Sequence, residues 1–127
     1  MTAGVTLRFS SVDNHLWVIL SDTSAFANAV LIANFTTWND LKDQTCVVLA
    51  SQCTGLTHKS CISYRHVKKV ALHQLEALER SGLINCYTAV SPQLLRQIRR
   101  GVVDSSYTPN EIVTEATRQG FDAPSVC

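Results

Sequence analysis

HLWVILSD (residues 15–22) and VLIANFTT (residues 30–37) are apolar runs rich in β-branched and aromatic side chains, and polar residues bound each of them. Runs of this length and composition predict β-strands, here over residues 16–20 and 29–35. Three further short runs of the same kind follow between turn-rich pieces, at residues 46–50, 61–64 and 67–70. Such a series is typical of an antiparallel barrel or sandwich, and closing the sheet into a barrel would remove its exposed edges.

The second half of the chain has a helical period instead of a strand period. ALHQLEALERSG (residues 71–82) places its leucines on one helical face, and Gly82 is expected to end that helix. SPQLLRQIRRG (residues 91–101) begins with Ser91 as the cap and a proline at the first helical position, and Gly101 is expected to end it.

A third helix is predicted to begin at TPNE, with Thr108 as its cap and Glu111 completing a capping box, and to end at Gly120. The whole chain is therefore expected to be a single α+β domain of residues 1–127. Residues 1–70 would form its β-barrel part and residues 71–127 its helical part.

Composition limits the classes of function. The chain has 127 residues, 46% of them hydrophobic, and a net charge of only +1, which argues against a protein that coats long stretches of nucleic acid. No apolar segment is long enough to span a membrane and no leader peptide is evident, so we expect a cytoplasmic protein that does not bind membranes.

The cysteines are odd in number, which favours free thiols in a reducing compartment. They are Cys46, Cys53, Cys61, Cys86 and Cys127. Cys53, His58 and Cys61 are close in sequence, but no second ligand cluster completes a tetrahedral zinc site. We therefore expect five reduced cysteines, no disulfide and no bound metal.

The first two predicted strands resemble the first two core strands of the PemK/MazF toxin family. The first strand of that family typically reads Arg-Pro-x-Leu-Val-Leu-Ser, which sets His15 at the arginine and Ser21 at the serine. The second commonly ends Pro-Ile-Thr, and here Asn-Phe-Thr ends at Thr36 in that place. This resemblance covers about residues 12–70.

A second resemblance is to a group of small uncharacterised bacterial proteins distantly related to those toxins. It lies in CTGLTHKSCISY (residues 53–64), SPQLLRQIRRG and SSYTP. Proteins of this group often carry His-Pro-Phe-Ile-x-His-x-Ser-x-Val-x-Tyr at the first of these segments. His58, Ser60, Ile62 and Tyr64 match that pattern, whereas Cys53 replaces its first histidine.

The resemblance implies a small SH3-like antiparallel β-barrel followed by short helices, often a homodimer, that belongs to a bacterial toxin–antitoxin system. Such toxins are endoribonucleases that use no metal or other cofactor. Their partners are RNA and a protein antitoxin. The arginine and the threonine of the two strands contribute to cleavage, so the resemblance implies roles for His15 and Thr36 in this chain.

Metal-free RNA cleavage needs a base for the 2′-hydroxyl, an acid for the leaving oxygen and a cation or donor for the phosphate. Histidine can be the base or the acid, but it clamps phosphate less well than arginine. The candidate catalytic residues are therefore His15, Thr36 and His58. The candidate residues for binding phosphate and RNA are Lys59, Ser60 and Trp38.

Each candidate also has a structural interpretation. His15 before a strand and Thr36 at a strand end are also explained as hydrogen-bonded loop residues, THKS as a polar turn, and Trp38 as a packing residue. The alternative function is accordingly a non-catalytic SH3-like interaction module that holds a protein partner. The two functions differ in whether one concave surface brings His15, Thr36 and His58 within reach of one phosphate.

Overall fold

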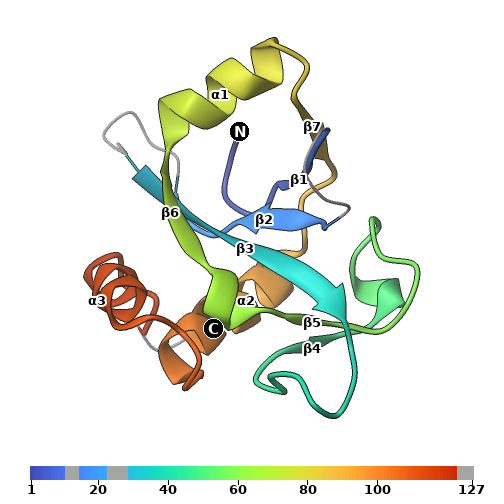
Figure 1. Cartoon of the computed structure of the whole chain (residues 1–127), viewed down its shortest axis with the longest axis vertical. Coiled ribbons are helices and arrows are strands. Elements are labelled where there is room, and N and C mark those ends of the chain that lie inside the picture. The colour runs from blue at the N-terminus through green and yellow to red at the C-terminus, as the bar shows by residue number, and fades with distance from the viewer. Residues whose placement is uncertain (11–14, 23–28, 123–127) are drawn as a thin grey trace.

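The computed structural model describes residues 1–10, 15–22 and 29–122. Among these residues, seven strands form an antiparallel sheet that three α-helices cover, so the prediction of an α+β fold is confirmed (Figure 1). The strands are β1 (Thr6–Phe9), β2 (Trp17–Ile19), β3 (Ala29–Thr37), β4 (Val47–Val48), β5 (Ser60–Ile62), β6 (Lys68–Ala71) and β7 (Ile84–Tyr87). The helices are α1 (Leu72–Arg80), α2 (Pro92–Asp104) and α3 (Asn110–Arg118). None of the described helices has the length and apolar character needed to cross a membrane.

Strand β3 is the centre of the sheet, because three strands pair with it (Figure 1). Ile32 pairs with Ile19 of β2 and with Lys68 of β6, so these two strands lie on opposite edges of β3. Strand β5 pairs with residues 35–37 of β3, along the same edge of β3 as β6. The 3₁₀ helix η2 (Tyr64–His66) interrupts that edge between β5 and β6. The bend therefore faces β3 near residues 33 and 34, whereas Thr36, at the C-terminal end of β3, pairs with Cys61 of β5.

The sheet is antiparallel but open. Its hydrogen-bonded order is β4-β5-β3-β2-β1-β7, with β6 on β3, and within the described residues β4 and β7 do not pair. The predicted closed SH3-like barrel is therefore not confirmed. The reason lies in β4: only Val47 and Val48 are extended, and the chain then turns into the 3₁₀ helix η1 (Ala50–Gln52). Two residues offer too short an edge for a closing strand.

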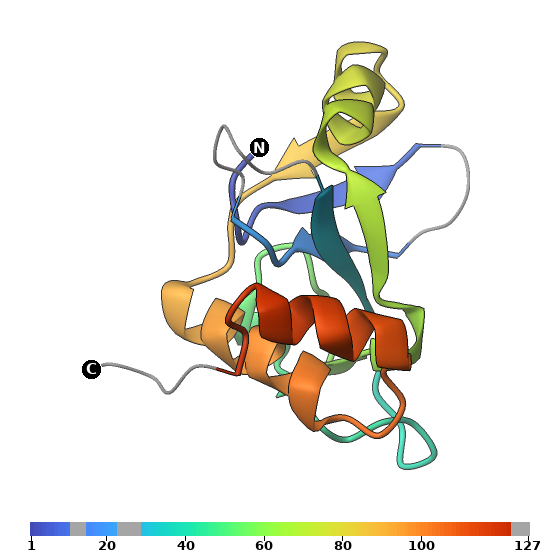
Figure 2. The same cartoon turned by 90° about the vertical axis from the view of Figure 1, so that its left-hand side faces the viewer.

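Both faces of the sheet are buried, which explains why its strands read as continuous apolar runs. Alternate residues of β3 point to opposite faces: Leu31 and Ala33 join a core with α2 and α3, whereas Val30 and Ile32 join a core with α1. Figure 2 shows α2 and α3 side by side, with α1 at the other end of the molecule.

The helices begin and end partly as predicted. Helix α1 ends before Gly82, whose φ of 76° is favoured by glycine. Ser91 caps α2, because its hydroxyl accepts a hydrogen bond from the amide of Leu94. The prediction that Gly101 ends α2 is wrong, since the helix continues to Asp104.

The predicted capping box of the third helix is also absent. Helix α3 begins at Asn110, with Pro109 as the residue before it, and no side chain caps its first turn. Thr108 lies one residue too early to reach the exposed amides, and its buried hydroxyl has no partner among the described residues. Gly120 follows the helix with a φ of 84°, as predicted for its end.

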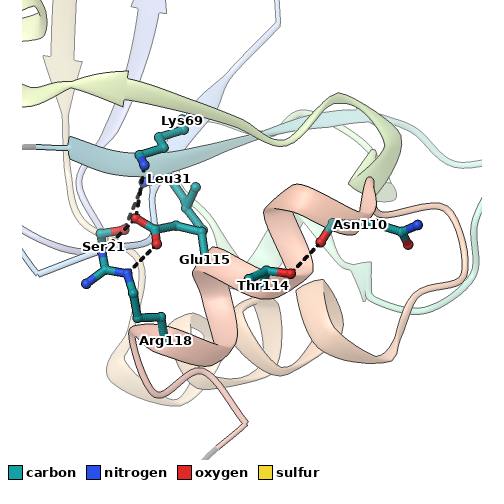
Figure 3. A network of polar contacts seen from close by, with 7 residues as sticks. All are labelled: Ser21, Leu31, Lys69, Asn110, Thr114, Glu115 and Arg118. Atoms are coloured by element: carbon teal, nitrogen blue, oxygen red, sulfur yellow. Dashed lines mark hydrogen bonds and ion pairs between the residues drawn. The ribbon is translucent and has the colours of Figure 1, made fainter.

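An ion-pair network joins α3 to the sheet (Figure 3). The Glu115 carboxylate accepts hydrogen bonds from Arg118 at 2.6 and 2.7 Å, and Lys69 of β6 lies 3.4 Å from it. The bonds from Arg118 and Lys69 outweigh the effect of burial and lower the pKa of Glu115 to about 2. Nearby, the Ser21 hydroxyl accepts a hydrogen bond from the amide of Leu31.

Candidate functional site

The three predicted catalytic side chains, from His15, Thr36 and His58, line one cavity of about 300 Å³. We call it the His58 cavity. The other residues that line it are Arg8, Leu16, Phe35, Thr37, Gly55, Leu56, Thr57 and Ser60. They come from β1, from the ends of β2 and β3, and from the loop that leads into β5.

His15 is held at the mouth of this cavity by the backbone of β3. Its Nδ1 lies 3.2 Å from the carbonyl oxygen of Phe35. A carbonyl oxygen only accepts hydrogen bonds, so Nδ1 carries the proton in this contact. In the neutral ring Nε2 then holds the lone pair, which is the state that a general base requires.

Two threonines hold the imidazole ring of His58. Its Nε2 lies 2.8 Å from Oγ1 of Thr37, and its Nδ1 lies 3.0 Å from Oγ1 of Thr57. A hydroxyl can donate or accept, so these partners satisfy either neutral tautomer and also the imidazolium. The ring can therefore change its protonation state without losing a hydrogen bond.

The hydroxyl of Thr36 is oriented by Lys42, a residue that the sequence analysis did not select. Lys42 Nζ donates a hydrogen bond of 2.8 Å to Thr36 Oγ1. Because an ammonium group is only a donor, the threonine oxygen must accept here. The Thr36 hydroxyl consequently keeps its own proton for donation to a different acceptor, and the side chain lines the cavity.

Arg8 also lines the His58 cavity, and the sequence analysis missed it as well. Its Nη2 donates a hydrogen bond of 3.1 Å to the carbonyl oxygen of Gly55. The guanidinium group thus supplies at this cavity the permanent positive charge that the sequence lacks at His15. The one local sign in the sequence that Arg8 has a special role is its position as a cation inside the apolar run of residues 5–9.

Two of the three predicted RNA-binding residues lie outside the lining. Lys59 Nζ stands 3.8 Å from the ring centre of Trp38, and the indole Nε1 donates to Gln44 at 2.6 Å. The two side chains therefore contact each other and do not line this cavity. Ser60 does line it, but its hydroxyl donates to the carbonyl oxygen of His58 at 3.1 Å and so holds the loop.

A second cavity of about 300 Å³ adjoins the first, because His15 and Thr36 line both. We call it the Tyr107 cavity. Its other lining residues are Asn34, Leu41, Lys42, Asp43, Cys61, Ile62, Ser63, Tyr64, Arg65, His66 and Tyr107. The shared residues are His15, which precedes β2, and Thr36, near the end of β3, so the two cavities lie next to each other.

The described cysteines are free thiols: Cys46, Cys53, Cys61 and Cys86. Burial raises the pKa of each of them, so all four favour the protonated form. Cys127 lies outside the described residues. Within those residues, Cys53, His58 and Cys61 do not converge, and no other three metal-binding side chains do.

No protein-family model, curated protein or solved structure matches this chain. Its function must therefore be inferred from the chemistry of its own residues.

Proposed function

We propose that this chain acts on RNA as a metal-independent endoribonuclease, and that the His58 cavity holds the phosphate that is attacked. One observation carries the proposal: His15, Thr36 and His58 were selected from the sequence as a proton-transfer and phosphate-binding set, and they line one cavity. Scattered side chains would have favoured the interaction module instead.

The reaction follows from the two histidines. His15 Nε2 takes the proton of the ribose 2′-hydroxyl, and the 2′-oxygen forms a bond to phosphorus. The bond from phosphorus to the 5′-oxygen then breaks, and His58 as imidazolium protonates the leaving oxygen, which replaces Thr37 as the partner of its Nε2–H. The products are a 2′,3′-cyclic phosphate and a 5′-hydroxyl, so atoms and protons balance without any co-reactant.

Arg8 and Thr36 stabilise the charge that develops on the phosphate. The guanidinium group stays charged at any pH of interest and can donate two hydrogen bonds to phosphate oxygens. The Thr36 hydroxyl accepts from Lys42, so its own proton can be donated to a third oxygen. Donors fixed in this way stabilise a transition state more than mobile water does.

The test is cleavage of a short RNA of mixed sequence, labelled at one end, with EDTA present throughout. We expect the His15→Ala and His58→Ala variants to lose activity by about 10²- to 10⁴-fold, the usual effect of one general acid or base. The rate should follow a bell-shaped pH profile. His73→Ala is the matched control, because His73 is exposed on α1 and lines neither cavity.

Undiminished cleavage by the double variant His15→Ala, His58→Ala would refute this mechanism. Loss of activity in EDTA would refute the metal-independent reaction. Expression in a bacterial host gives an independent check, in which we expect growth arrest with degraded RNA for the native chain and normal growth for His15→Ala.

A second function, of a different class, is a non-catalytic module that holds a protein partner such as an antitoxin. The observation in its favour is Leu41, which is 93% exposed and stands at the Tyr107 cavity. Together with Tyr107, which is 48% exposed at the same cavity, it provides apolar surface that suits a protein contact. An inactive native chain that binds a protein partner through Leu41, and loses it on Leu41→Asp, would establish this function instead.

A further inference from the structure

The Tyr107 cavity has a lining suited to a nucleotide. Four side chains that carry or can carry positive charge line it: His15, Lys42, Arg65 and His66. Asp43 is the acidic residue in this lining, and hydrogen bonds occupy its carboxylate: Oδ1 accepts from Thr45, and Oδ2 accepts from Ser105 at 2.5 Å. The cavity therefore presents cations to an anionic ligand, while its carboxylate is engaged elsewhere.

Tyr107 gives the cavity an aromatic surface. The residue is 48% exposed, and the guanidinium carbon of Arg65 lies 5.2 Å from the centre of its ring. This cation–π contact holds the ring in place from one side and leaves much of the side chain open. An exposed aromatic ring of fixed orientation is the kind of surface on which proteins stack unpaired bases.

Asn34 adds an unsatisfied polar group. It is only 4% exposed, it lines the Tyr107 cavity, and its Oδ1 has no hydrogen-bond partner among the described residues. A buried amide oxygen without a donor costs free energy, and an N–H group of a ligand would recover it. Nucleobases carry such donors on their pairing edges.

From these three observations we infer that the Tyr107 cavity is a second subsite of the RNA site. It holds the nucleotide next to the phosphate in the His58 cavity, with the base stacked on Tyr107 and its N–H edge toward Asn34. Lys42 and Arg65 face the neighbouring phosphate. This inference rests on the proposed function and deepens it, because the two cavities meet at His15 and Thr36 and can hold consecutive nucleotides of one strand.

The experiment measures binding apart from cleavage. Fluorescence anisotropy is recorded with 2′-O-methyl RNA of mixed sequence, which lacks the nucleophilic hydroxyl, for the native chain and for Tyr107→Leu. Tyr87→Leu is the matched control, since Tyr87 is 47% exposed and lines neither cavity. We expect Tyr107→Leu to weaken binding by about tenfold or more, the effect of losing one stacked base, and Tyr87→Leu to leave it unchanged.

Two further arms separate the outcomes. A free nucleoside monophosphate is tested as competitor: weak competition relative to the oligonucleotide supports an RNA subsite, and competition of equal strength would overturn it in favour of a nucleotide pocket. If the native chain cleaves RNA but Tyr107→Leu behaves like Tyr87→Leu in binding and in KM, this inference fails and the proposed function stands. If Tyr107-dependent binding is found without cleavage, the subsite stands and the endoribonuclease fails. If the native chain binds no RNA, both fail.

Discussion

Tyr64 lies against Gly101 inside helix α2, and its hydroxyl donates a hydrogen bond of 3.0 Å to the carbonyl oxygen of Ile98. A Cβ atom on Gly101 would stand 1.9 Å from that hydroxyl oxygen and 2.4 Å from the ring carbon that bears it. The glycine is therefore required by the space that a buried ring occupies and not by its backbone angles. This contact fixes the chain just after β5 against α2, and Tyr64 itself lines the Tyr107 cavity.

The first prediction is that Gly101→Ala destabilises the protein. Helix propensity alone would favour alanine by about 1 kcal/mol. The clash with Tyr64 should outweigh this gain, because forcing extra volume into a packed core costs about 1–3 kcal/mol. Urea unfolding followed by circular dichroism measures the difference. In the double variant Tyr64→Leu, Gly101→Ala the alanine should cost less than it does beside tyrosine, and an equal cost in both backgrounds would contradict this explanation.

The second prediction concerns acid stability. The folded pKa of Glu115 is lowered to about 2 from an ordinary value near 4.5. A lowered carboxyl pKa stabilises the folded state above the unfolded pKa, and this contribution is lost as the pH falls toward the folded pKa. Native protein should therefore be more stable than Glu115→Gln at pH 7, and the difference should shrink between about pH 4.5 and pH 2. Parallel urea titrations test this, with exposed Glu111→Gln as the control on the same helix.

The third prediction concerns Arg8. Arg8→Gln should lower kcat/KM for RNA by about 10²-fold, the order of effect seen when one fixed donor to a developing negative charge is removed. Arg8→Lys should recover only part of the loss, because an ammonium group keeps the charge but not the paired donors. Thermal unfolding must be measured alongside, since Arg8 also bonds the carbonyl oxygen of Gly55. An Arg8→Gln variant with native kcat/KM would remove Arg8 from the mechanism.

The fourth prediction concerns thiol reactivity. Burial and a hydrogen bond with Glu79 raise the pKa of Cys86 to about 11, so at pH 8 only about one molecule in a thousand carries the thiolate. Iodoacetamide should therefore label Cys86 slowly in the native protein although it is not fully buried. Glu79→Gln should speed the labelling, as peptide mass mapping would show. Equal rates in both proteins would exclude an effect of Glu79.

The central strands could be predicted from the sequence because their signal is local. The nine residues of β3, Ala29–Thr37, form a run of apolar and β-branched side chains that the prediction shortened by only two. Strands β1 and β7 were missed for the opposite reason. Each has four residues, and Thr6 pairs with Tyr87 far along the chain, so their pairing depends on contacts that no local pattern records.

The candidate site was predictable to a similar extent. The resemblance to the toxin strands selected His15 and Thr36, and the second resemblance selected His58; the three residues line one cavity. Arg8 and Lys42 were not selected, because a local sequence pattern does not show which cavity a positively charged side chain reaches in the folded protein. The error at Gly101 has the same origin, because a ring from another segment fills the space at that glycine. The error at Thr108 is local, because α3 begins one residue later than predicted.

The pairing of β1 with β7 has a consequence for how the protein is made. Translation releases the N-terminus first, so β1 leaves the ribosome long before its partner at Ile84–Tyr87 has been synthesised. Arg8 belongs to β1 and pairs with Asn85 of that late strand. A nascent chain that still lacks β7 holds β1 only by its pairing with β2 at Thr6 and Leu7, which stops short of Arg8. The cavity is therefore completed only after about two thirds of the chain has been synthesised. Any activity toward RNA would begin only after that point in translation.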